Sequence, residues 1–183
     1  NELFSHWYFP FVVKTAGGTI AILSTQRTTP FLTNTGFRRI PCAVYNNASG
    51  NIDIFYDSFG GPVRFISWDD QESGSHRLLS AGAATSYTPV STIGGVSPTA
   101  ASAVISLYMY NATAGGNMDV RPLGSSSVAG ICRTTVTPAT GAVTDGQVNL
   151  MLRGSAGGLE YKLGSGTNSP GYIDTSGWWE VAS

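Results

Sequence analysis

WYFPFVVKTAGGTIAILST, residues 7–25, indicates the fold class. Two runs of aromatic and β-branched residues flank Gly17-Gly18, and such a glycine pair predicts the tight turn of an antiparallel hairpin. No stretch of the sequence shows the helical spacing of apolar residues over eleven or more positions. The sequence therefore predicts an all-β, antiparallel protein.

The same pattern continues along the chain, as short runs rich in Val, Ile, Thr and aromatic residues separated by Gly, Pro, Asn and Ser. Strands that recur about every eight to twelve residues are typical of sandwiches and barrels. After the hairpin, the predicted strands are 40–45, 51–56, 63–68, 103–110, 117–121, 128–136, 147–153, 159–163 and 178–181.

An internal match joins VYNNASGNIDI, residues 44–54, to MYNATAGGNMDV, residues 109–120. Both segments end a strand in Tyr-Asn, turn on small residues and resume with alternating polar and apolar residues. Alternation in a strand directs the apolar set to one face, here Ile52, Ile54, Met118 and Val120.

The match predicts two related, antiparallel β-sandwich or jelly-roll-like halves. They would span residues 1–90 and 103–183, joined by a linker at 91–102 that contains Gly94-Gly95 and Pro98. A single compact duplicated domain is the alternative, and chance convergence of two hairpins is another.

Composition narrows the class of protein. Only 11% of the 183 residues are charged, against about 25% in typical soluble domains, so Ser, Thr, Asn and Gly must build the surface. Such surfaces are common in extracellular and virion β-proteins. The net charge is -1 and the longest basic run is Arg38-Arg39, which argues against nucleic-acid binding. No apolar stretch approaches ~20 residues, so no membrane insertion is expected.

The cysteines and the acidic run do not predict a metal centre. Cys42 and Cys132 lack zinc-site spacing and each lies in an apolar run, which favours two free buried thiols, with a disulfide as the alternative. Asp69-Asp70-Gln71-Glu72 offers oxygen ligands without the alternating order of a calcium loop. We expect an acidic surface loop, no metal and no cofactor.

No catalytic residue is predicted, because the sequence shows no hydrolase, zinc-protease or nucleotide-binding motif. One alternative is a Ser-His-Asp triad that uses His76 near Asp69-Asp70. A second is a glycosidase-like carboxylate pair. Its members would come from Asp69, Asp70, Glu72, Asp174 and Glu180, whose spacing does not favour it.

Carbohydrate binding is the ligand class that the tryptophans suggest. Trp68 precedes Asp69 and Asp70, and Trp178-Trp179 precedes Glu180, so each pairs an indole with a carboxylate. An indole stacks on the apolar face of a sugar while carboxylates accept its hydroxyls. Neighbouring side chains in a strand point to opposite faces, so at most one of Trp178 and Trp179 belongs to the core. A core Trp plus an interface Trp is the alternative.

Three short segments resemble β-rich modules of tailed-phage fibre, tip and other virion appendage proteins. They are NMDVRPLGSS at 117–126, QVNLML at 147–152 with LEYK at 159–162, and GWW at 177–179. The resemblance implies a homotrimer or another symmetric assembly, with other virion proteins as partners and receptor contact rather than turnover. It transfers no site residue.

The sequence thus predicts a non-enzymatic virion structural or receptor-binding protein, in a virion or extracellular. It would assemble with neighbouring subunits, as a trimer or another homo-oligomer, and contact host-surface glycans. The first alternative is a monomeric extracellular carbohydrate-binding module, and the second is a carbohydrate-active enzyme.

Overall fold

The structure is a computed structural model. It describes residues 3, 5–25, 36–39, 43–53, 55–58, 63–69, 76–92, 94–111, 116–126, 132–135, 142–152, 158–164 and 170–181. All the regular elements among the described residues are β-strands. They form three sheets, and all strand pairs are antiparallel. The predicted all-β, antiparallel class is therefore confirmed.

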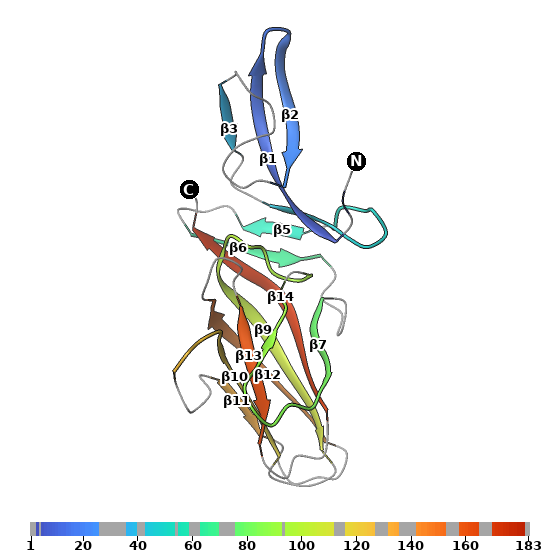
Figure 1. Cartoon of the computed structure of the whole chain (residues 1–183), viewed down its shortest axis with the longest axis vertical. Helices are drawn as coiled ribbons and strands as arrows, with labels where there is room; N and C mark the ends of the chain where they lie inside the picture. Colours follow the sequence, from blue (N-terminus) through green and yellow to red (C-terminus); the bar gives the residue numbers. More distant parts are fainter. Residues whose placement is uncertain are drawn as a thin grey trace.

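A six-stranded sheet forms the larger layer of the lower part of the molecule, which we call the body (Figure 1). The C-terminal strand β14 lies in its centre, between β9 and β6, and β7 pairs with the first part of β14. The members are β12 (Ala142–Met151), β9 (Ala100–Asn111), β14 (Gly171–Val181), β6 (Val63–Trp68), β5 (Phe55–Ser58) and β7 (Arg77–Gly82).

A four-stranded sheet forms the second layer of the body and contributes to the same core. Alternate residues of β9, from Ala103 to Met109, are fully buried, and Met118 and Val120 of the second sheet are fully buried as well. This is the period-two pattern of strands that bury one face. The strands are β11 (Cys132–Thr135), β10 (Asn117–Pro122), β13 (Leu159–Leu163) and β8 (Thr88–Val90).

The third sheet projects from one end of the body, and we call its strands β1, β2 and β3 the arm (Figure 1). The predicted hairpin is confirmed, since β1 and β2 pair from Phe9↔Ser24 to Thr15↔Gly18. Gly18 has a φ of 132°, a value that L side chains rarely adopt, which explains glycine at this turn. The strands are β1 (His6–Thr15), β2 (Gly18–Ser24) and β3 (Phe37–Arg39), with β4 (Val44–Asn46) pairing with the start of β1.

The predicted linker at 91–102 is packed into the body. Thr92, Val96 and Ser97 are buried, and the Thr92 carbonyl accepts hydrogen bonds from the amides of Gly95 and Val96. Strands from either side of this segment share sheets, because β8 pairs with β13 and β6 pairs with β14. The boundary between 1–90 and 103–183 therefore does not divide the sheets.

The two matching segments differ in their pairing. In the first, Asn46 and Ile52 form a bridge across the turn, whereas in the second β9 and β10 belong to different sheets. Met118 and Val120 are fully buried as predicted, but Ile52 is 42% exposed, so its predicted inward position was wrong. Ile54 lies outside the described residues.

The described residues bear on the cysteines, on metal binding and on membrane spans. Cys42 lies outside the described residues, so its state remains a prediction. Among the described residues, no group of three or more His, Cys, Asp or Glu side chains is placed to hold a metal ion. The same part of the chain contains no helix with the length and apolar character needed to cross a membrane.

Candidate binding surface

Trp68 lies in the core of the body. Its side chain is 1% exposed, its Nε1 donates a 2.9 Å hydrogen bond to the Gly95 carbonyl, and its ring stacks on His76 at 4.0 Å. Both its apolar face and its polar edge are therefore occupied. The stacking surface that the sequence suggested at Trp68 is not presented to a sugar.

Trp178 joins the same core cluster. It is fully buried, and its ring centroid lies 5.1 Å from that of Trp68 and 5.4 Å from that of Trp7. The structure thus brings together the two tryptophans that the sequence assigned to separate glycan sites. They form an aromatic core that includes the first strand of the arm.

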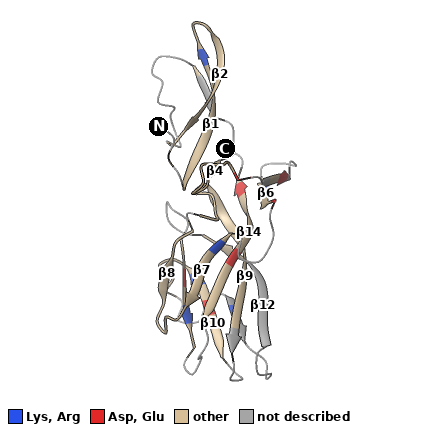
Figure 2. Cartoon of the chain, turned by 90° about the vertical axis from the view of Figure 1, so that its right-hand side faces the viewer, with Lys and Arg blue, Asp and Glu red and all other residues tan. Residues whose placement is uncertain are grey.

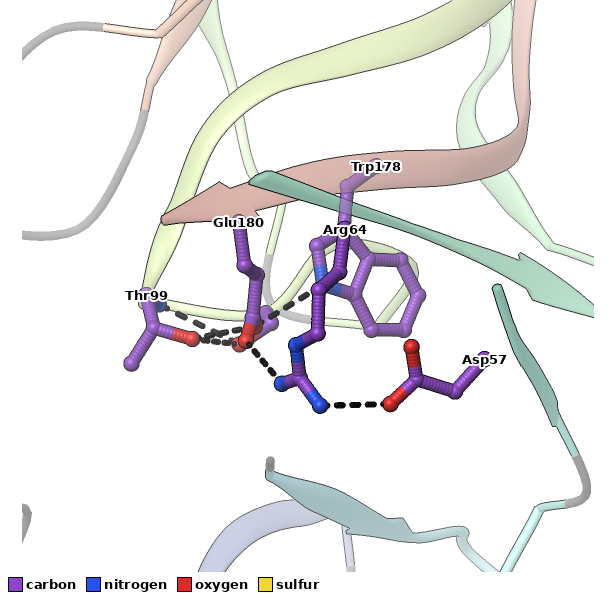
Figure 3. Close-up of polar contacts among 6 residues, drawn as sticks. Asp57, Arg64, Thr99, Trp178 and Glu180 are labelled. Atoms are coloured by element: carbon purple, nitrogen blue, oxygen red, sulfur yellow. Dashed lines mark hydrogen bonds and ion pairs between the residues drawn. The ribbon is translucent and has the colours of Figure 1, made fainter. Parts of the chain in front are cut away.

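Glu180 sits beneath Trp178 in a buried polar cluster (Figure 3). Its Oε1 accepts hydrogen bonds from Trp178 Nε1, at 2.9 Å, and from the Thr99 hydroxyl, while Oε2 lies 3.5 Å from Arg64 Nη2. Arg64 Nη1 also binds Asp57 Oδ2 at 2.5 Å. Because Glu180 is 3% exposed and bound on both oxygens, it serves packing rather than an external ligand.

Two further carboxylates of the candidate sites, Asp69 and Asp174, lie among the described residues and have different partners. Asp174 binds Arg77 through both oxygens, at 2.7 and 3.1 Å. Asp69 is exposed, and its hydrogen bond to the Tyr56 hydroxyl, together with its charge, raises the pKa of Tyr56. Asp70 and Glu72 lie outside the described residues. Of the described candidates, Asp174 and Glu180 are thus each in contact with an arginine, and Asp69 with a tyrosine.

Trp179 points to the opposite face from Trp178, as strand alternation predicted. It lies on the outer face of the six-stranded sheet and is only partly buried. Phe65 of β6 is its direct cross-strand partner, with ring centroids 4.9 Å apart and planes inclined by 42°. Trp179 Nε1 donates a 3.3 Å hydrogen bond to Asn149 Oδ1 on β12. This pair of partly exposed rings is the aromatic feature of the candidate site on the outer face.

Strand register sets the neighbours of the two rings. Phe65, Trp179, Ser102 and Met151 form one row across four strands, with Ser102 opposite both Trp179 and Met151. Met151 in this row is 72% exposed, and the adjacent row contributes Val63, which is 52% exposed, and Val181, which is 61% exposed. We call this surface the aromatic shelf, made of Val63, Phe65, Val104, Asn149, Met151, Trp179 and Val181; none of them is charged.

Gly177 allows the shelf to form. A Cβ at this position would lie 2.3 Å from the Ile66 carbonyl oxygen and 3.0 Å from the Phe65 ring. Only glycine therefore lets β6 approach β14 closely enough for Phe65 to lie beside Trp179. The sequence identified Trp179 but missed Phe65, Asn149 and Met151. Alternation within each strand was visible, but the identity of the partner strands was not.

The polar groups of the shelf suit neutral ligands. Asn149 accepts a hydrogen bond from Trp179 with its Oδ1, and the residue is exposed, so its amide group can also donate to a ligand. No protein-family model matches the chain, and no curated protein matches it. Function is therefore inferred from the geometry of the chain itself.

Proposed function

We propose that the chain is a non-enzymatic binding protein of a virion or virion appendage, and that the aromatic shelf is its contact with neutral saccharides of a host surface. The observation that supports this most directly is the partly exposed Trp179–Phe65 pair within the uncharged aromatic shelf. Two adjacent rings offer a platform for the apolar faces of sugar rings. Asn149 adds an amide for sugar hydroxyls.

Several properties support a binding role over turnover. Glu180 and Asp174, two of the carboxylates considered for catalysis, are buried and bound to arginines. The low content of charged residues fits a displayed β-protein, and the segments at 117–126 and 147–152 resemble phage appendage modules. Several copies in one assembly would raise the avidity of a weak shelf by multivalency.

A monomeric extracellular carbohydrate-binding module is the second candidate, because the same shelf would serve it equally well. The two candidates differ in assembly and not in the ligand site. The mass of the chain in solution therefore separates them, whereas a saccharide-binding assay tests the feature that they share.

The test is binding to an array of neutral glycans, followed by calorimetry on the strongest ligand. We expect Trp179→Ala to weaken binding at least about tenfold, as for a buried aromatic anchor. Leu123→Ala removes an apolar side chain that is 39% exposed and lies outside the shelf, after β10, and should bind like the unaltered protein. Trp68 and Trp178 are unsuitable positions because their loss would disturb the core.

Two results would refute the proposal. One is that the unaltered chain binds no neutral glycan on the array. The other is that Trp179→Ala binds with unchanged affinity. Far-ultraviolet circular dichroism of each variant ensures that lost binding does not reflect lost folding.

A further inference from the structure

Charge is divided unevenly between the arm and the body. Residues 1–52 contain four basic side chains, Lys14, Arg27, Arg38 and Arg39, and one acidic side chain, Glu2, whereas residues 53–183 contain ten acidic and six basic side chains. Figure 2 accordingly shows blue but no red on the arm. A nearly neutral chain thus consists of a basic end and an acidic body.

The described cations of the body are neutralised within it. Arg64, Arg77, Arg121, Arg133 and Lys162 each lie within ion-pair distance of a carboxylate of the body. Lys14, on the arm, is exposed and has no carboxylate within ion-pair distance in the described part of the chain. The charge of Lys14 is therefore available for a partner.

In the described part of the chain, β2 is an edge strand of the arm. Among the described strands β2 pairs only with β1, and its sequence GTIAILS has no charged residue. Ile20 and Leu23 are 44% and 46% exposed. Natural proteins usually protect such edges with charges, prolines or bulges, so an apolar, uncharged edge on a projecting hairpin is suited to pairing with another strand.

The body has an edge of opposite character at β5. Within the described sheet β5 pairs only with β6, and Tyr56 on it is 63% exposed. Asp53 precedes β5, and Asp69 follows the segment of β6 that pairs with it, hydrogen-bonded to Tyr56. Neither Asp53 nor Asp69 has a cation within ion-pair distance among the described residues. This edge is therefore acidic where the arm is basic.

We propose that the arm of one copy docks on the body of a second copy, with β2 lying along the β5 edge and Lys14 near Asp69. Within one chain β2 and β5 belong to different sheets, and the β1–β2 hairpin extends away from the body with Trp7 packed in the core at its root (Figure 1). The contact joins two different surfaces, so it generates a closed ring, such as a trimer, or an open filament. It goes beyond saccharide binding and does not depend on it.

Light scattering of the whole chain tests this contact, with two charge-reversed variants. The arm variant carries Lys14→Glu and Ile20→Glu, and the edge variant carries Tyr56→Lys and Asp69→Lys. We expect the unaltered chain to form multiples of 19.2 kDa and both variants to be monomers. An equimolar mixture should assemble again, because the reversed arm of the first variant fits the reversed edge of the second, and the unaltered arm of the second fits the unaltered edge of the first. A chain with all four substitutions should assemble again.

Three results would overturn the proposal. The first is an unaltered chain that stays monomeric at every soluble concentration. The second is an edge variant that assembles like the unaltered chain, which would indicate symmetric pairing of β2 with β2. The third is that two folded monomeric variants fail to associate when mixed. Saccharide binding by the variants is read separately, since neither alters the shelf, so failure of one proposal is distinguishable from failure of the other.

Discussion

Trp7 of the arm meets Trp178 of the last strand edge-on, with ring centroids 5.4 Å apart and planes at 87°. This is a favourable geometry for two aromatic rings. Trp7 also lies 5.2 Å from Tyr45 and 6.0 Å from Trp68. The arm is therefore anchored in the body by its own first strand, and the stability of the two parts is coupled.

We expect Trp7→Ala to lower the free energy of unfolding by about 3–5 kcal/mol, the usual cost of removing a large buried aromatic side chain. Chemical denaturation followed by circular dichroism measures this change. Trp179→Ala is the matched control, because that indole lies on the outer face, and its cost should be clearly smaller. Equal costs for the two variants would contradict the anchoring role.

The buried cluster around Glu180 predicts a second effect on stability. Glu180→Ala leaves Arg64 with only Asp57 and removes the acceptor of Trp178 Nε1, so we expect a loss of about 3–5 kcal/mol. Asp174→Ala breaks an ion pair with Arg77, whose side chain is 30% exposed, and should cost less. Denaturation midpoints at constant pH compare the two, and the reverse order would count against a structural role for Glu180.

Substitution of Gly177 should disturb both the sheet and the shelf. The added Cβ of Gly177→Ala would clash with backbone of β6, and such overpacking costs about 1–3 kcal/mol. Gly94→Ala is the control, because the nearest atom to its Cβ would be the Tyr45 hydroxyl at an ordinary 3.7 Å. Thermal unfolding of both variants tests this, and a fully stable Gly177→Ala would show that the strands can separate freely.

Alkaline stability should depend on Tyr87. Its ring lies 3.4 Å from the Arg121 guanidinium carbon, and burial, reinforced by the charge of Asp119, raises its pKa. A pKa raised in the folded state gives stability that is present below the unfolded value, about 10, and is lost as pH rises through the folded value.

Tyr87→Phe should remove this alkaline loss. It should also leave neutral stability equal or higher, because the Tyr87 hydroxyl is buried without a hydrogen-bond partner among the described residues. Unfolding measured from pH 7 to 11 in both proteins gives the comparison. Curves that fall in parallel above pH 10 would assign the alkaline loss to other groups.

Local patterns in the sequence predicted much of the fold. The glycine turn gave the β1–β2 hairpin, and alternation located β6, β10 and β13 nearly to the residue. β14 was predicted only from Trp178, yet it begins at Gly171. The first part of β14 was not recognised as a strand. Its pairing with β9 and β7 on both sides, rather than the β propensity of its own residues, keeps it extended.

The candidate site was predictable only in part, for a related reason. Alternation showed that Trp178 and Trp179 face opposite sides, but not which side is the core. Phe65 and Asn149 reach Trp179 through β6 and β12, and cross-strand neighbours of distant segments follow from topology rather than from local sequence. A tryptophan next to a carboxylate in the sequence was therefore a poor predictor of an exposed stacking surface, since Trp68 and Trp178 both pack inward.

The central place of β14 has a consequence for the order in which the protein acquires its structure. β5, β6 and β7 are synthesised before residues 171–181. Those residues form β14, the strand that pairs with β6 and β7 in the same sheet. The hairpin of β1 and β2 needs only its immediate neighbours and can form while the chain is being synthesised. The pairing of β14 with β6 and β7 joins segments that are far apart in the sequence, and such pairings are slow to form. Until they do, the nascent body exposes the edges of β6 and β9, and this is the stage at which a chaperone would matter most.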